Sequence, residues 1–282
     1  MKLLRYGSPG KEKPALLDEE GRYRDLSDKI NDIDGEVLAP ERLAALAKID
    51  TASLPVIEGS MRLGPPVAGV GKIIAVGINY SAHGEETKFD IPSDPILFSK
   101  AITSLSGPND PVVLPKGSKK GDWEVELAVI IGKRAQYVSQ ADAMGVIAGY
   151  SIMNDVSERD YQLERDGQWT KGKSFDSFAP LGPWLVTPDE VPEPQSLNLW
   201  LDVNETRMQD GNTSTMIFGI TQLVSSISSY MTLLPGDVIA TGTPSGVGLG
   251  QEPPIFLKPG DVMRLGVEGL GEQRQEVKAW ED

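Results

Sequence analysis

Asp122-Trp123-Glu124-Val125-Glu126-Leu127-Ala128-Val129-Ile130-Ile131-Gly132 is the stretch from which the fold is best read. After Glu124 its residues are almost all β-branched or apolar, and the run ends at a glycine, so it predicts a β-strand. Successive side chains of a strand point to opposite faces, which puts Glu124 and Glu126 on one face, roughly 7 Å apart along the backbone. The side chains at 125, 127 and 129 then face a core. The stretch therefore predicts a strand that carries two neighbouring carboxylates.

Two neighbouring carboxylates repel one another unless one of them keeps its proton or a cation stands between them. A divalent metal removes the repulsion, and oxygen ligands favour Mg²⁺, Mn²⁺ or Ca²⁺ over Zn²⁺. A solvated outer face of an antiparallel strand explains the same pattern equally well. Both interpretations stay open at this point.

A third carboxylate and a group of cations follow along the chain. Asp155 comes near the end of a strand expected over 150–156, and it could join the two glutamates if that strand lies beside the first. Beyond it stand polar side chains that suit an anionic substrate, because Arg grips a carboxylate through two hydrogen bonds and Lys acts as a point charge. They are Arg159, Gln162, Lys171 and Lys173. Ordinary surface charge explains each of them equally well when it is taken singly.

His83 is the one histidine of the chain. It lies in a polar loop expected over 81–95, just after a buried strand expected over 72–80, and Glu86 follows it closely. A histidine beside a carboxylate is suited to act as a general base, since the carboxylate orients the ring and stabilises its charged form. A surface histidine in a polar loop is the more common explanation of such a residue alone, and no G-x-S-x-G motif of a serine hydrolase accompanies it.

The composition limits the class of protein. With 282 residues, 39% of them hydrophobic, the chain suits one large domain plus a small appendage. The formal net charge of −14 disfavours nucleic acid and anionic membranes as partners, and no run of about eighteen apolar residues is present to span a bilayer. The chain has no cysteine, which excludes disulfides and thiolate sites and agrees with a cytoplasmic location.

Strands dominate the expected fold. Residues 1–68 are expected to form a small N-terminal domain, and residues 69–282 a larger domain. Helices are expected at 40–48, at 139–149, where Ser139 and Asp142 resemble a capping box, and at 215–231, where apolar residues recur at helical spacing; the polar segment 158–165 is helical at best. This irregular order argues for an α+β, β-rich fold and against a doubly wound parallel sheet. Strands are expected at 1–6, 14–18, 72–80, 96–99, 112–114, 150–156, 183–187, 197–203, 206–208, 237–241, 262–266 and 276–280, with turns at 211–212 and 269–271.

Gly167-Gln168-Trp169-Thr170-Lys171-Gly172-Lys173-Ser174 matches the phosphate-binding pattern G-x-x-x-x-G-K-S. That function needs the loop between a buried strand and a helix, so that backbone N–H groups and the helix N-terminus meet the phosphates. The residues before the match are charged, and Pro180 prevents a long helix after it. The match is therefore weak support for a nucleotide site.

Taken in order, these motifs resemble those of the fumarylacetoacetate hydrolase family, from about residue 70 to the C-terminus. The matching motifs are Gly77-Ile78-Asn79-Tyr80 with His83 and Glu86, Glu124-x-Glu126, Asn154-Asp155 with Arg159-Asp160 and Gln162, Gly172-Lys173-Ser174-Phe175-Asp176, and Thr241-Gly242-Thr243-Pro244. The resemblance implies a mixed β-roll catalytic domain with a small N-terminal domain, usually in a homodimer. It also implies one Mg²⁺ or Mn²⁺ ion held by Glu124, Glu126 and Asp155.

The resemblance implies a reaction on a small anionic 2-keto acid. Within the family, the motif around Lys173 and the chain length look most like the bacterial 2,4-diketo-3-deoxy-sugar-acid hydrolases, which are often labelled ureidoglycolate lyases. We therefore expect a metal-dependent hydrolase that cleaves the C–C bond of such a sugar acid, or of an acylpyruvate, to pyruvate and a carboxylic acid.

The expected roles of the residues form a hypothesis about this reaction. Three carboxylates leave about half of the positions of an octahedral metal open, enough for the carboxylate and keto oxygens of the substrate. His83, oriented by Glu86, would take the proton of an attacking water, and Lys173 would stabilise the enolate that leaves. The other side chains expected to bind the substrate are Arg159, Gln162 and Thr243.

Two other functions stay open. An oxaloacetate decarboxylase or a 2-keto acid isomerase of the same family would use the same metal without an attacking water. A non-catalytic small-anion-binding β-protein would keep the fold without needing the metal. The sequence names neither the acyl group nor the choice between Mg²⁺ and Mn²⁺, which favour the same oxygen ligands.

Overall fold

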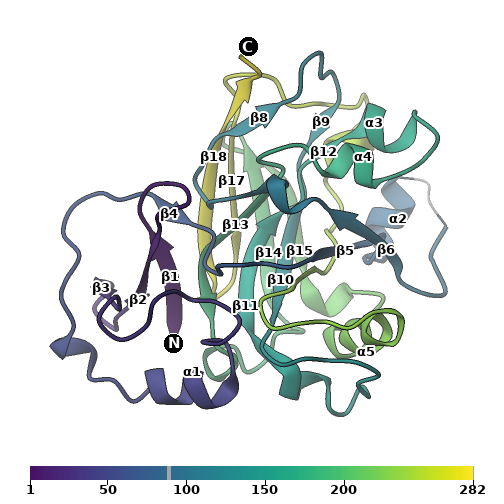
Figure 1. Cartoon of the computed structure of the whole chain (residues 1–282). Coiled ribbons are helices and arrows are strands. Elements are labelled where there is room, and N and C mark those ends of the chain that lie inside the picture. The colour runs from purple at the N-terminus through teal and green to yellow at the C-terminus, as the bar shows by residue number, and fades with distance from the viewer. Residues whose placement is uncertain (88–89, 282) are drawn as a thin grey trace.

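The computed structural model describes residues 1–87 and 90–281. Most of its regular structure is strand, and short helices lie around the sheets (Figure 1). The α-helices are α1 (Pro40–Leu46), α2 (Ser81–Thr87), α3 (Arg159–Leu163), α4 (Thr170–Lys173) and α5 (Ile220–Tyr230). Single turns of 3₁₀-helix occur at Thr51–Ser53, Ile102–Ser104, Ala143–Val146, Pro188–Glu190, Thr213–Thr215 and Gly248–Gly250. The expected α+β, β-rich fold is confirmed.

The largest sheet has 11 strands and runs in the order β3-β2-β1-β13-β11-β10-β16-β5-β6, with β4 paired to β1 and β7 to β13. Its pairs are antiparallel except for β16 with β5 and β13 with β7. This mixed order excludes a doubly wound parallel sheet. The strands are β1 (Lys2–Tyr6), β2 (Lys13–Leu17), β3 (Tyr23–Asp25), β4 (Leu63–Gly64), β5 (Ile73–Gly77), β6 (Ile96–Lys100), β7 (Leu105–Ser106), β10 (Val125–Ile131), β11 (Ile147–Asn154), β13 (Ala179–Val186) and β16 (Val238–Ala240).

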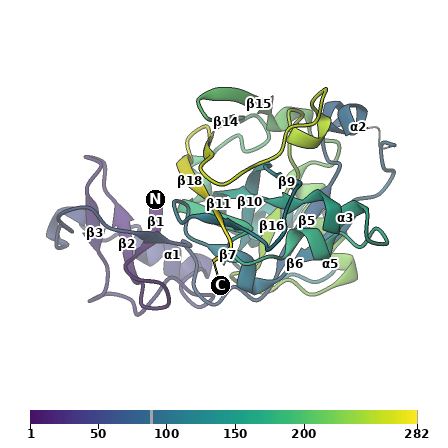
Figure 2. The same ribbon diagram turned by 90° about the horizontal axis from the view of Figure 1, so that it is seen from above.

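A second sheet of 5 strands packs against the first, in the order β15-β14-β17-β18-β8. Seen from above, β14 and β15 lie over the layer that contains β10 and β11 (Figure 2). The hairpin expected across residues 269–271 is confirmed, because Val267 pairs with Gly271. The strands are β8 (Val112–Leu114), β14 (Asn198–Val203), β15 (Thr206–Asn212), β17 (Val262–Val267) and β18 (Gly271–Ala279), and a separate short pair joins β9 (Gly121–Asp122) to β12 (Ser157–Glu158).

Strand β10 borders two hydrophobic cores. Val125, Leu127 and Val129 face the core between the sheets, which α5 also lines. On the opposite face, Ala128 and Ile130 belong to a second core that includes side chains from the first 54 residues. The strand is buried along its whole length. The interpretation of its glutamate face as a solvated surface is therefore wrong.

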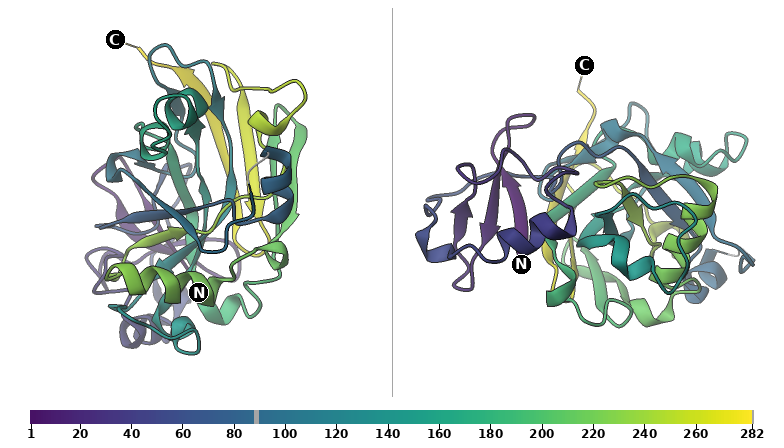
Figure 3. Two further views of the ribbon diagram at one scale, coloured as in Figure 1. Left: turned by 90° about the vertical axis from the view of Figure 1, so that its right-hand side faces the viewer. Right: turned by 60° about the horizontal axis from the view of Figure 1, so that its bottom comes forward.

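Residues 1–68 form the group of elements at one side of the molecule (Figures 1 and 3). Their first strand continues the large sheet, since β1 pairs with β13 through Lys2 with Val186 and Leu3 with Leu185. The boundary at residue 68 stays a prediction. In the parts of the chain that the structure describes, no helix has both the length and the apolar character needed to cross a membrane.

Several local expectations are corrected. The helix expected over 139–149 is limited to one 3₁₀ turn, Ala143–Val146, because β11 begins at Ile147. Ser139 and Asp142 do bond to each other, but they close a turn rather than a helix. The helix expected from residue 215 begins at Ile220, after a 3₁₀ turn.

Two turns and loops also differ from expectation. Residues 211–212 lie inside β15, and the chain reverses instead at Asn204 and Glu205, which both adopt positive φ angles. The loop expected over 81–95 begins with helix α2, so His83 and Glu86 lie on a helix. Residues 88 and 89 of that loop lie outside the described residues.

Candidate active site

The predicted carboxylates come together at the start of β10 and the end of β11. The two strands are paired, with Val125 opposite Asn154, and the ladder continues as the N–H of Asp155 donates to the carbonyl of Glu124 at 2.9 Å. One oxygen each from Glu124, Glu126 and Asp155 lies within 4.8 Å of the others, and all three side chains are buried. We call these residues the carboxylate cluster.

Two lysines and an arginine neutralise much of this charge. Lys173 Nζ lies 2.7 Å from Glu124 Oε2 and 2.8 Å from Asp155 Oδ2. Lys100 Nζ pairs with the other oxygen of Asp155 and also donates to the carbonyl of Val156 at 3.2 Å. Both lysine side chains are buried. Asp155 therefore has a lysine on each of its two oxygens.

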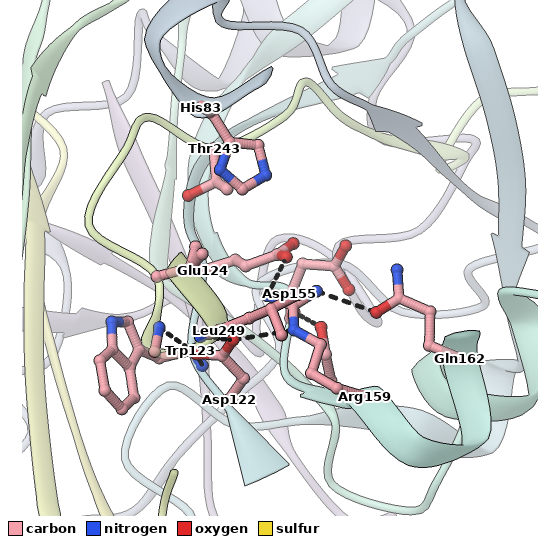
Figure 4. A network of polar contacts seen from close by, with 12 residues as sticks. His83, Asp122, Trp123, Glu124, Asp155, Arg159, Gln162, Thr243 and Leu249 are labelled. Atoms are coloured by element: carbon pink, nitrogen blue, oxygen red, sulfur yellow. Dashed lines mark hydrogen bonds and ion pairs between the residues drawn. The ribbon is translucent and has the colours of Figure 1, made fainter. Parts of the chain in front are cut away.

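Arg159 fixes one edge of the site (Figure 4). Its Nε donates to Asp122 Oδ2 at 2.8 Å, its Nη2 lies 2.7 Å from Glu124 Oε1, and its Nη1 donates to Gln162 Oε1 at 2.9 Å. Asp122 in turn accepts the N–H groups of Gly248 and Leu249, at 2.7 and 2.9 Å. Nε and one N–H of Nη1 are thus bonded to the protein, whereas Nη2 is paired with Glu124 by charge and makes no hydrogen bond among the described residues. Nη2 and the NH₂ group of Gln162 are the donors left to meet a substrate.

The carboxylates differ in how readily they ionise. Burial favours the protonated form of Glu124, but the Lys173 and Arg159 cations outweigh it and lower the pKa of Glu124 to about 2. Burial raises the pKa of Glu126 well above its usual value, and the charges of Asp155 and Glu124 raise it further. Glu126 accepts one hydrogen bond, from the N–H of Gly242 at 2.8 Å. Of the two glutamates, Glu126 is therefore the one that its surroundings shift toward the protonated form.

The lysines differ in the same way. Burial lowers the pKa of Lys100; Asp155 opposes this effect and the neighbouring Lys173 ammonium adds to it. Burial also acts to lower the pKa of Lys173, but Asp155 and Glu124 outweigh burial and raise it. Lys173 lines the cavity described below, whereas Lys100 lies behind Asp155 on β6.

The residues of the carboxylate cluster fit a hard divalent cation. They offer oxygen ligands that converge within 4.8 Å, which is the donor set that Mg²⁺ and Mn²⁺ prefer. The ammonium of Lys173 already lies between two of the three carboxylates, so the place is one that a positive charge stabilises. A divalent ion would also remove the reason for Glu126 to stay protonated.

His83 lies on α2, across from the carboxylate cluster (Figure 4). It is 7% exposed, so the interpretation as a surface histidine is wrong. Its Nδ1 is 3.5 Å from Glu86 Oε2. Both oxygens of Glu86 also accept the N–H of Gly246, at 2.9 and 3.0 Å, which ties α2 to the chain after β16. Glu86 thus holds the helix as well as facing the histidine.

Thr243 lines the same cavity as His83 (Figure 4), and its hydroxyl is already hydrogen-bonded within the protein. The hydroxyl donates to the carbonyl of Val125 at 2.8 Å and accepts from Gln209 Nε2 at 2.7 Å. Its proton is therefore not free to bind a substrate, and the remaining lone pair and the methyl group are what it offers. This narrows the role expected for Thr243.

These groups surround one narrow cavity, in which only about 20 Å³ is open to a water-sized molecule. His83, Glu124, Glu126, Arg159, Gln162, Lys173 and Thr243 all line it, together with apolar side chains that include Phe98 and Trp169. Apart from Lys171, the structure therefore brings together the residues that the sequence analysis singled out for binding or catalysis, with Glu86 next to His83 and Asp155 next to Lys173.

The phosphate-binding pattern at 167–174 does not have the arrangement that a phosphate loop needs. Helix α3 precedes it rather than a strand, and the helix inside it, α4, has only 4 residues. Lys173 points instead to two carboxylates. Lys171, which the sequence grouped with it, is exposed and donates to the carbonyl of Arg165.

Sequence reasoning missed Lys100, Asp122 and the apolar part of the cavity. Lys100 follows Phe98 by two residues on β6, and both are buried. Alternation along that strand was a usable signal, because it places both side chains on one face. Asp122 carried no local signal, since its partners Arg159, Gly248 and Leu249 are distant in the sequence.

The chain is similar to known proteins over most of its length. Residues 72–278 match the family model described as fumarylacetoacetate (FAA) hydrolase, C-terminal. The chain is 54% identical over 281 residues to a 2,4-didehydro-3-deoxy-L-rhamnonate hydrolase of Sphingomonas sp. (strain SKA58), covering 99% of this chain and 97% of the relative.

Solved structures give the same result. A fumarylacetoacetate hydrolase from the psychrophilic Exiguobacterium antarcticum has a TM-score of 0.89 at 34% identity, with 99% of this chain and 100% of that chain covered. A maleylpyruvate hydrolase from Sphingobium sp. SYK-6, solved in complex with manganese(II) ion and pyruvate, has a TM-score of 0.84 at 30% identity, with 100% of each chain covered.

Proposed function

The chain belongs to the fumarylacetoacetate hydrolase family as one of its enzymes, and we propose that it is a metal-dependent hydrolase of 2,4-diketo acids. The products would be pyruvate and a carboxylic acid. The observation that carries this proposal is the buried carboxylate cluster in one cavity with His83 and Lys173. The 54% identity to a 2,4-didehydro-3-deoxy-L-rhamnonate hydrolase supports a 2,4-diketo-3-deoxy sugar acid as the substrate, with acylpyruvates as simpler analogues.

Glu124, Glu126 and Asp155 would hold Mg²⁺ or Mn²⁺. The neighbour with manganese and pyruvate supports a divalent ion. Bound there, the ion would polarise the 2-oxo group and stabilise negative charge on it. Lys100 is paired with one oxygen of Asp155. The other oxygen, which is paired with Lys173, would be the one available to bind the ion.

His83 would act as the general base that removes a proton from water, while the oxygen of that water adds to the C4 carbonyl carbon. The C3–C4 bond then breaks, and its electron pair moves into the enolate of pyruvate, which takes up a proton at C3. Lys173, whose pKa is raised by its carboxylates, would donate a hydrogen bond to the enolate oxygen. Glu86 stabilises the positive charge that His83 acquires, and the NH₂ group of Gln162 would bind a substrate oxygen.

The test is release of pyruvate from a panel of acylpyruvates and 2,4-diketo-3-deoxy sugar acids, with and without EDTA. We expect turnover that EDTA abolishes and that added Mg²⁺ or Mn²⁺ restores. Lys173→Met should abolish turnover, and Lys171→Met is the matched control because Lys171 is exposed and lies outside the cavity. Turnover unaffected by EDTA would contradict the metal role.

An oxaloacetate decarboxylase in the same cavity would release CO₂ without consuming water. If the protein releases CO₂ from oxaloacetate faster than it releases pyruvate from every diketo acid, it is a decarboxylase and the hydrolase proposal is refuted. The homodimer and the cytoplasmic location stay predictions. Light scattering in solution would measure the molar mass and so test the homodimer.

A further inference from the structure

An apolar wall completes the cavity next to the carboxylate cluster. It is made by Gly77 at the end of β5, Phe98 on β6 and Trp169 at the start of α4. Trp169 lies four residues before Lys173 and has helical backbone angles. Residues four apart in a helix project from the same side, about 5.4 Å apart along the axis. The indole therefore lies one helical turn from the ammonium that we propose to meet the enolate.

Gly77 sets the position of this indole. A Cβ atom at residue 77 would lie 2.3 Å from Cζ3 and 2.8 Å from Cη2 of Trp169, far inside van der Waals contact. The φ angle of Gly77 lies outside the left-handed region, so the backbone itself would accept an alanine. What the missing methyl group provides is the space that the six-membered ring of the indole occupies.

Phe98 holds the indole from a second direction. The two rings meet edge to face, with centroids 5.4 Å apart and planes inclined at 61°. Lys173 Nζ lies 5.1 Å from the centroid of the same phenyl ring. Because little of the cavity is wide enough for a water molecule, a displacement of the indole by the width of one methyl group changes which molecules fit.

We propose that Gly77 and Trp169 form a size gate, in which Gly77 positions the indole and the indole limits the length of the acyl chain that the site accepts. This inference rests on the function proposed above and adds which part of the substrate is selected, namely the carbon chain beyond the cleaved bond. A saturated chain, with or without hydroxyls on its outer edge, presents C–H groups that pack on an aromatic face. One methylene group in an apolar pocket changes kcat/KM by about 10- to 200-fold. The position of the Trp169 indole alone is therefore enough to set the preferred length of the acyl chain.

The test measures kcat/KM for acylpyruvates with straight acyl chains of increasing length. In Gly77→Ala the added methyl group would displace the indole that lines the cavity, so we expect kcat/KM for the longest chain to fall by at least about tenfold relative to the shortest. Trp169→Phe removes the clashing ring and should raise the relative kcat/KM of the long chains; combined with Gly77→Ala, it should restore the wild-type preference. Gly145→Ala is the matched control, since a Cβ there meets nothing within 4 Å.

The size gate is overturned if Gly77→Ala lowers kcat/KM equally for every chain length, or if Trp169→Phe fails to rescue it. If circular dichroism shows that Gly77→Ala is unfolded, Trp169→Phe and Trp169→Leu decide alone, and an unchanged preference overturns the gate. Calorimetric Kd values for uncleavable 2-oxo acids, from 2-oxobutyrate to 2-oxooctanoate, measure the same selectivity without turnover. Length-dependent binding that follows the variants, in a protein that releases no pyruvate, would contradict the proposed function and support the gate.

Discussion

The two sides of the cavity are held in place in different ways. On the strand side, the carboxylate cluster lies at the start of β10 and the end of β11, which are paired with each other and buried. On the helix side, His83 and Glu86 sit on α2, a helix of 7 residues, and so short a helix depends on contacts with the rest of the chain. Glu86 provides one such contact through Gly246. The carboxylates, which repel one another, are thus held by a buried pair of strands. The proposed base, His83, is held by a short helix that depends on tertiary contacts.

Damage to the strand side should therefore affect folding and activity together, and damage to the helix side mainly activity. Asp155→Ala should have the largest effect. It leaves Lys100 and Lys173 buried without a shared carboxylate, and removal of one partner from a buried ion pair costs about 3–5 kcal/mol. Urea unfolding measures the free energy of unfolding, and calorimetry measures Mg²⁺ binding, which should be lost.

The control for Asp155→Ala is Glu272→Ala, which breaks the exposed ion pair between Glu272 and Arg264. Exposed pairs contribute about 0–1 kcal/mol, so this change should be nearly silent in both measurements. Equal losses of stability in the two variants would show that the buried ion pairs of Asp155 contribute no more to stability than an exposed pair does.

His83→Ala should lower kcat by about 10²–10⁴-fold, as is typical for removal of a general base. The Kd for Mg²⁺ should stay near its wild-type value, since the proposed ligands are Glu124, Glu126 and Asp155 and not His83. Full activity in His83→Ala would refute the proposed water activation. A large loss of Mg²⁺ affinity would refute the separation of the two sides.

Glu86→Gln should have a smaller effect on kcat than His83→Ala. The amide oxygen can still accept the N–H of Gly246, which Glu86 accepts at 2.9 Å, so α2 stays attached while the negative charge beside His83 is removed. Steady-state kinetics should show a lower kcat with little change in KM. If kcat does not change, the charge of Glu86 has no part in the reaction.

The smallest effect is expected from Glu126→Gln in the metal-free protein. The pKa of Glu126 in the folded protein is raised above the usual value of 4.5. At pH values between 4.5 and the raised pKa, the folded protein therefore holds a proton that the unfolded chain has lost. The free energy of unfolding of the wild type should then fall with pH relative to Glu126→Gln, by up to about 1.4 kcal/mol per pH unit until the raised pKa is passed. Urea unfolding in EDTA at several pH values measures this slope. Parallel curves for the two proteins would show that Glu126 ionises normally.

The strand side was predictable because strand geometry is a strong local rule. The alternation around Glu124 and Glu126 placed both carboxylates on one face, and the strand ending near Asp155 pairs directly with it. What the local pattern could not decide was whether that face is solvated. The answer depends on the second core behind β10, to which distant residues such as Leu3 and Leu16 contribute.

The helix side was less predictable. The segment 81–87 is polar and contains Gly84, so neither apolar spacing nor propensity favoured a helix. Its helix is held by tertiary bonds, such as that from Glu86 to Gly246, which no local pattern contains. The opposite error occurred at 139–149, where a capping-box pattern was outweighed by the pairing of β11 from Ile147.

Lys100 shows how a strand boundary affects the prediction of a site. The strand was expected to end at residue 99, one residue too early, and β6 includes Lys100. That one residue decides whether the lysine is read as a loop cation or as a buried partner of Asp155. Arg159 shows a different limit, because the sequence identified a substrate ligand and could not show that Asp122 and Gln162 already accept two of its N–H groups.

Because β10 borders both hydrophobic cores, its side chains are constrained from two directions. A substitution on one face of the strand would require side chains such as Leu265 to repack, and a substitution on the other face side chains such as Leu16. New substrate preferences within this scaffold are therefore expected to evolve through α2, the residues around Trp169 and the segment near Leu249, where a change meets only the cavity and its near neighbours. The residues on and next to β10 are expected to stay the same, whereas those around the mouth of the cavity are expected to vary between enzymes with different substrates.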